Sequence, residues 1–126
     1  MKLLRFSPIF LAMLFWAGTA DASWPEGEVV PFGLLIANND GGDDFEKLRY
    51  AQRDAEKVRD VLQDLGELTT ERSLMLAGEE ADDARDAMRE IESRMAKAKE
   101  QGNTTMLIFY FSGHAKDGSL LLDDSR

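Results

Sequence analysis

His114 is the residue whose type and position best fit catalytic chemistry. It is the only histidine in the chain, and it follows a long apolar and aromatic run, Thr104–Phe111, that breaks at Ser112-Gly113. An imidazole exchanges protons near neutral pH, so a histidine here can serve as general acid or base. A surface histidine in a turn is the competing interpretation, and position alone leaves both open.

Asp54 is the second candidate, because it lies at the edge of an apolar helical stripe and near the amino end of that helix. The stripe is formed by apolar residues that recur at spacings of three and four, namely Leu48, Ala51, Ala55, Val58, Leu62 and Leu65. Gly66 is expected to end the helix. A solvated acid favoured by the helix dipole is the competing interpretation of Asp54.

The elements that must position these residues alternate between strand and helix. Strands are expected over Phe32–Ala37, Ser73–Ala77 and Thr104–Phe111, and the unbroken apolar character of the last predicts burial on both faces. A second helix is expected over Asp82–Glu100, with Asp82 or Asp83 as its N-cap. Its inward face is expected to hold Ala84, Met88, Ile91, Met95 and Ala98.

This alternation, with right-handed crossovers, predicts an α/β fold: a parallel, doubly wound sheet with flanking helices. In such sheets functional groups collect at the carboxyl ends of the strands. The amino terminus of the first helix faces the same side. Asp54 and His114 are therefore expected at the same end of the sheet.

Composition limits the possible functions. The chain has 24 acidic and 15 basic residues, a net charge of −9, and no cysteine. The acidity argues against nucleic acid or an anionic membrane as a partner, because both attract a basic face. Without cysteine the chain forms no disulfide and offers no thiol nucleophile.

Residues 1–22 are predicted to be a signal peptide. Lys2 and Arg5 precede an apolar core, Ile9–Ala17, and Ala20-Asp21-Ala22 forms a cleavage site before Ser23. Cleavage after Ala20 and an uncleaved anchor are the alternatives. The core is shorter than the roughly 20 residues of a membrane span, so we expect export to the periplasm or the extracellular space without stable membrane insertion.

Three segments together resemble the caspase-like cysteine peptidases, which include caspases, metacaspases and bacterial orthocaspases. Phe109–His114 resembles the family's histidine motif, Phe32–Asn39 its first strand, and Leu48–Ala55 the segment that opens its first helix. The resemblance extends from Pro31 to about Leu122 and implies the caspase-like fold. The chain departs from the family in two places: Ala115 stands where the family usually has glycine, and the nucleophilic cysteine is absent.

The resemblance implies a role for each candidate residue. His114 would be the catalytic partner of a cysteine, and the peptide N–H of Ala115 would be an oxyanion-hole donor. Asp54 would line the pocket for the substrate's Arg or Lys, as in metacaspase-like members. Caspases proper prefer Asp and build that pocket from arginines, which have no clear counterpart in the matching loop. The family's cysteine motif follows the histidine by about 50 residues. Residues 23–126 are therefore expected to be the amino-terminal portion of a peptidase domain, incomplete at the C-terminus, that acts on peptide or protein substrates.

No metal or other cofactor is expected. The polar loop Asn38–Asp44 crowds carboxylates and amides, but its spacing does not fit an EF-hand, and a solvated, flexible loop is the expected structure. A non-catalytic caspase-like scaffold or binding module remains the main alternative function. A flavodoxin-like or receiver-like domain is the third, and the signal peptide argues against a cytoplasmic receiver.

Overall fold

The structure, a computed structural model of the chain, describes residues 28–122. The expected signal peptide lies outside this range. The described elements, in chain order, are β1 (Val29–Ala37), α1 (Ala51–Asp64), the short 3₁₀ helix η1 (Thr70–Arg72), β2 (Ser73–Ala77), α2 (Ala81–Glu100), β3 (Thr104–Ser112), β4 (His114–Lys116) and β5 (Ser119–Leu121).

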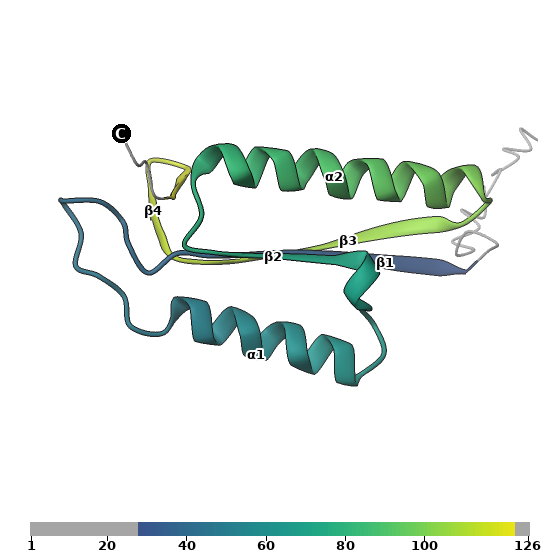
Figure 1. Cartoon of the computed structure of the whole chain (residues 1–126), viewed down its shortest axis with the longest axis horizontal. Coiled ribbons are helices and arrows are strands. Elements are labelled where there is room, and N and C mark those ends of the chain that lie inside the picture. The colour runs from purple at the N-terminus through teal and green to yellow at the C-terminus, as the bar shows by residue number, and fades with distance from the viewer. Residues whose placement is uncertain (1–27, 123–126) are drawn as a thin grey trace, which may run out of the picture.

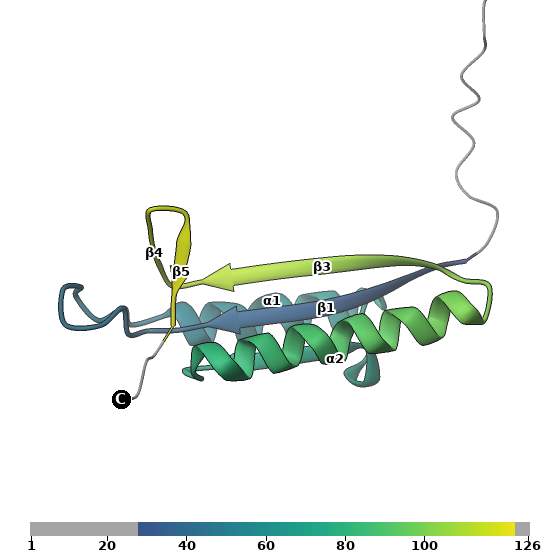
Figure 2. The same ribbon diagram turned by 90° about the horizontal axis from the view of Figure 1, so that it is seen from above.

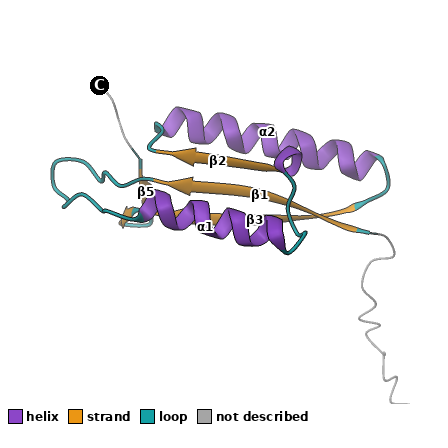
Figure 3. Cartoon of the chain, turned by 60° about the horizontal axis from the view of Figure 1, so that its bottom comes forward, coloured by secondary structure: helices purple, strands orange, loops and turns teal. Residues whose placement is uncertain are grey.

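Strands β2, β1 and β3 form a parallel sheet in that spatial order. Helix α2 covers one face of the sheet and α1 the other, as Figures 1 and 3 show. Strands β4 and β5 form a separate antiparallel hairpin. The predicted parallel α/β sheet with flanking helices is confirmed, and β2 has the predicted bounds.

The core is built on β1, the central strand. Every residue from Phe32 to Ala37 is buried, because helices cover both faces. Alternate residues point to opposite faces of a strand. One set packs with α2 in a cluster of fully or largely buried residues that consists of Phe32, Leu34, Ile36, Ala87, Ile91 and Ala98. Of the positions expected inward on α2, Ala84, Met88 and Met95 pack against this cluster as partly buried side chains.

The prediction that Thr104–Phe111 is buried on both faces is wrong for the described sheet. Strand β3 lies at its edge, and Met106, Leu107 and Phe109 are 43, 39 and 45% exposed. An apolar run specifies a strand but does not specify its place in the sheet. The strand buried on both faces is β1.

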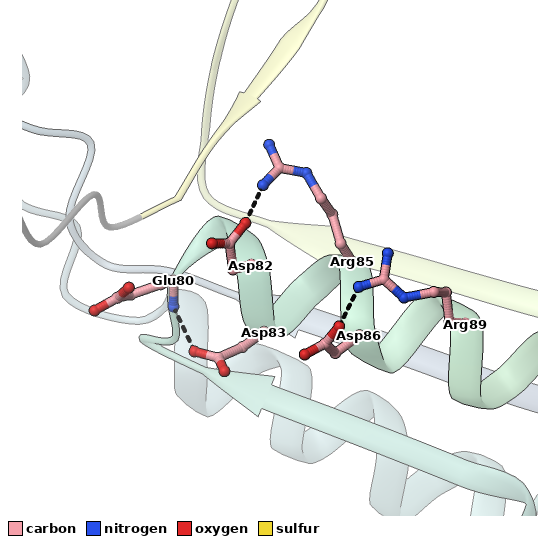
Figure 4. Close-up of polar contacts among 6 residues, drawn as sticks. All are labelled: Glu80, Asp82, Asp83, Arg85, Asp86 and Arg89. Atoms are coloured by element: carbon pink, nitrogen blue, oxygen red, sulfur yellow. Dashed lines mark hydrogen bonds and ion pairs between the residues drawn. The ribbon is translucent and has the colours of Figure 1, made fainter.

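The carboxyl end of α1 agrees with the prediction, whereas the N-cap of α2 differs from it. Gly66 has a φ of 77° just past α1, as predicted. The N-cap of α2 is Glu80 rather than Asp82 or Asp83. Asp83 instead takes the N3 position of a capping box and accepts a hydrogen bond from the Glu80 amide at 3.3 Å (Figure 4). Asp82 pairs with Arg85 on the exposed surface.

Leu65 is also placed differently from its expected position in the stripe. It is the C-cap of α1 and is 70% exposed. Among the described residues, no helix is long and apolar enough to cross a membrane.

Candidate active site

The candidate site lies at the carboxyl ends of the strands. Backbone hydrogen bonds join these ends: the Asn38 amide donates to the Ser112 carbonyl at 2.9 Å, and the Gly78 amide donates to the Ala37 carbonyl at 2.8 Å. The β4–β5 hairpin and the long loop between β1 and α1 extend from this end of the sheet, as Figures 1 and 2 show. His114 is the first residue of β4 and is half-buried.

The loop 38–50 covers His114. The histidine Nε2 lies 2.9 Å from the Glu46 carbonyl oxygen. The Phe45 ring lies against the imidazole with a centroid distance of 5.0 Å and a tilt of 40°. On the Gly41 side the backbone approaches so closely that a Cβ there would lie 2.4 Å from the histidine Cδ2.

The Glu46 contact decides which histidine nitrogen carries the proton. A carbonyl oxygen only accepts hydrogen bonds, so Nε2 donates and is protonated. In the neutral imidazole Nδ1 is then the basic nitrogen. The contact with the loop thus leaves Nδ1 as the ring nitrogen that can accept a hydrogen bond.

Local hydrogen bonds stabilise the loop 38–50, of which Asn38–Asp44 was expected to be solvated and flexible. The Asp40 amide donates to Asn38 Oδ1 at 3.0 Å, and the Gly42 amide donates to Asp40 Oδ1 at 3.0 Å. The Leu48 amide donates across the loop to the Asn39 carbonyl at 2.7 Å. These Asx-type turns give the loop a defined path over the imidazole.

Two asparagines at the start of the loop each have a buried side-chain atom without a hydrogen-bond partner. Asn38 is 2% exposed, and its Nδ2 has no partner, although its Oδ1 is used in the first turn. The Oδ1 of Asn39 is likewise buried without a partner. Unsatisfied buried polar groups are uncommon, and they lie here beside the candidate catalytic residue.

A cavity of about 440 Å³ adjoins His114 and is lined by the last part of the loop, residues 46–50. Arg49 is among these residues. No hydrogen bond or ion pair joins its guanidinium to another residue in the described part of the chain, so it is free to meet an anionic group. Lys47, also in the lining, lies 3.8 Å from Asp40.

Asp54 does not line this cavity. It lies in the first turn of α1 and its side chain is exposed. The amino end of α1 is nevertheless at the same end of the molecule as β4, as expected (Figure 1). The structure thus places Asp54 and His114 at one end of the sheet without bringing them into contact.

Ala115 follows His114 on β4. Its φ is negative, so alanine adopts the conformation without strain. The β4–β5 turn, Asp117-Gly118, has φ values of 51° and 77°, and Lys116 pairs with Ser119 across it. Hydrogen-bonded and non-bonded pairs alternate in a hairpin, so the Ala115 N–H points away from β5.

Comparison with known proteins adds the deciding observation. The sequence model of the caspase domain matches residues 32–126, well over half of the chain. The chain belongs to the caspase-domain family. No curated protein and no solved structure gives a significant match.

Within this caspase domain, sequence reasoning missed the residues that surround the histidine. Glu46 contributes a backbone carbonyl, which has no signature in the sequence. Gly41 and Phe45 limit the space around the imidazole. In the sequence Gly41 is one of two consecutive loop glycines, and nothing distinguishes it from Gly42. Arg49 was missed, although it lies in Leu48–Ala55, the segment that resembles the start of the family's first helix. In the described part of the domain, no three His, Asp or Glu side chains gather as a metal site.

Proposed function

We propose that the chain provides the histidine part of an exported caspase-like cysteine endopeptidase whose cysteine lies beyond residue 126. The observation that carries this proposal is the His114 imidazole, held through Nε2 by Glu46 and adjoining a cavity large enough for a side chain. Membership of the caspase-domain family supports peptide or protein substrates.

The geometry supports a definite sequence of proton movements. Nδ1 of His114 would accept the thiol proton as the sulfur attacks the peptide carbonyl carbon. The Ala115 N–H would stabilise the oxyanion, and the protonated imidazole would then donate its proton to the leaving amine. Water would hydrolyse the resulting thioester, with His114 acting again as the base.

The reading frame beyond the codon for Arg126 tests this proposal. A strand that ends in a cysteine, about 50 residues after His114, is the expected result. The 126-residue chain alone should not cleave fluorogenic peptides, because it has no nucleophile. In the cysteine-containing product, His114→Ala should lower kcat/KM by at least a hundredfold. A frame without cysteine, or activity that survives His114→Ala, would contradict the proposal and favour a scaffold or binding module.

For specificity, we propose cleavage after Arg or Lys, with Asp54 as the carboxylate that binds the substrate's cation. Asp54 is exposed at the correct end of α1, which supports this assignment. A charge-assisted hydrogen bond contributes roughly 1.5–3 kcal/mol, so Asp54→Asn should lower kcat/KM for Arg and Lys substrates by about ten- to a hundredfold. Glu56→Gln, an exposed acid two residues further along α1, is the matched control and should have no effect.

One observation favours a different specificity. The free Arg49 guanidinium lines the cavity beside His114, whereas Asp54 does not. Arg49 would pair with a substrate Asp or Glu rather than with a base. Comparing Arg-, Lys- and Asp-linked substrates on the wild type, Asp54→Asn and Arg49→Gln separates the two. Loss of Asp cleavage in Arg49→Gln, with Arg substrates inert throughout, would replace the basic specificity with an acidic one.

A further inference from the structure

The imidazole of His114 is enclosed on two sides as well as hydrogen-bonded. Gly41 adjoins one part of the ring and Phe45 packs against it, while Glu46 holds Nε2. All three belong to the same loop, and the chain between them turns back through a hydrogen bond from the Phe45 amide to the Gly42 carbonyl at 3.1 Å. One loop thus sets both the position and the hydrogen bonding of the ring.

Gly41 is required by space rather than by backbone conformation. Its φ lies outside the left-handed region that favours glycine. A Cβ would lie 2.4 Å from Cδ2 and 2.7 Å from Cγ of His114, and 2.9 Å from the Phe45 Cβ. These distances are shorter than any van der Waals contact, so a methyl group at Gly41 must displace the imidazole or the loop.

Gly42, the next residue, has the opposite requirement. Its φ is 84°, and a Cβ there would meet nothing within 4 Å. Alanine at Gly42 would strain the loop backbone without touching the imidazole. The chain therefore contains its own control for the effect of loop strain.

Phe45 also contacts the β4–β5 hairpin through a second residue. The Lys116 ammonium lies over the Phe45 ring, 5.9 Å from its centroid, within the range of a cation–π contact. Lys116 is two residues after His114 on β4. The hairpin and the loop are thus joined through the Phe45 ring as well as through the histidine.

We propose that Gly41 and Phe45 are positioning residues that keep the His114 ring in the one orientation in which Nε2 meets the Glu46 carbonyl and Nδ1 is the free base. The consequence for catalysis rests on the proposed function; the effect on the imidazole does not. Substituting either residue should let the ring turn away from Glu46. The preference for a proton on Nε2 would then be lost.

The tautomer of His114 gives a direct test in the 126-residue chain. Because this is the sole histidine, its ring ¹⁵N signals report on one residue. At alkaline pH, where imidazole is neutral, the wild type should carry its proton mainly on Nε2. Gly41→Ala and Phe45→Leu should each lower the ratio of Nε2–H to Nδ1–H by about three- to tenfold, the equilibrium effect of losing one hydrogen bond. Gly42→Ala and Phe45→Tyr should keep the wild-type ratio.

An unchanged ratio in both Gly41→Ala and Phe45→Leu would overturn the proposal. So would an equal change in Gly42→Ala, because loop strain alone would then explain the effect. If Gly41→Ala does not fold, the Phe45→Leu and Phe45→Tyr pair decides.

Activity of the cysteine-containing product separates this proposal from the proposed function. If His114→Ala abolishes cleavage while Gly41→Ala and Phe45→Leu cleave normally, the positioning role fails and the peptidase stands. If the tautomer ratio shifts as expected but no variant or wild type cleaves any peptide, the positioning role stands and the peptidase fails. If both hold, Phe45→Leu should lower kcat more than it raises KM, and Phe45→Tyr should restore kcat.

Discussion

The two ends of the sheet are built differently. At the amino ends of the strands the connections are short and their polar groups are paired: the Ser73 hydroxyl donates to the Thr69 carbonyl at 2.9 Å, and the Arg94 guanidinium donates to the Glu71 carbonyl at 2.8 Å. At the carboxyl ends a long loop runs over His114, and Asn38 and Asn39 keep buried polar atoms without partners.

We infer from this difference that the two ends of the sheet have separate roles. Short, satisfied connections stabilise the fold, whereas a long loop with unsatisfied polar groups is typical of a functional site. The division is not absolute, because the hydroxyl of Thr105, near the amino end of β3, is also buried without a partner. Changes at the amino end should nevertheless alter stability, and changes at the carboxyl end should alter His114.

The largest effect is expected at Leu68, in the connection between α1 and η1. Its side chain is 2% exposed and packs against Gly33 of β1. Leu68→Ala removes buried methyl groups and leaves a cavity, so it should lower the free energy of unfolding by about 2–5 kcal/mol, measured by urea denaturation. The ¹⁵N signals of His114 should stay those of the wild type in the folded protein.

Leu65→Ala is the matched control, because Leu65 is 70% exposed three residues earlier. It should change the unfolding free energy by no more than about 0.5 kcal/mol. A large change in the His114 signals of folded Leu68→Ala would show that the two ends are coupled, against the division drawn here.

A smaller loss of stability but a larger change at His114 is expected from Asn38→Ala. The substitution removes the acceptor of the Asp40 amide, which should cost about 1 kcal/mol, partly offset because the unpaired Nδ2 also leaves the interior. Without this hydrogen bond the loop should hold the imidazole less firmly, and the ratio of Nε2–H to Nδ1–H tautomer should fall. Asn103→Ala, in the turn at the amino end, is the control and should leave the His114 tautomer unchanged.

Sequence patterns predicted the parts of this molecule that depend on periodicity and on turn residues. The strand at Ser73–Ala77, the end of α1 before Gly66, and the placement of His114 at the carboxyl end of a strand all followed from local chemistry. The apolar run of β3 did not indicate its edge position, because an edge strand and a central strand can share the same pattern. The surroundings of His114 were equally inaccessible, since a backbone carbonyl and the space above Gly41 depend on the path of a loop.

The smallest effect is expected at Glu71 in η1, and it should depend on pH. A hydrogen bond from its own backbone amide, helped by the Thr69 side chain, lowers the pKa of the Glu71 carboxyl from its usual 4.5. A lowered folded-state pKa stabilises the fold above pH 4.5, and this contribution disappears as the pH falls through the folded-state pKa. Glu71→Gln should therefore have a slightly lower Tm than the wild type at neutral pH and the same Tm in acid, as measured by circular dichroism. A Tm difference that stays constant over the whole pH range would mean that the Glu71 charge contributes nothing at this end of the sheet.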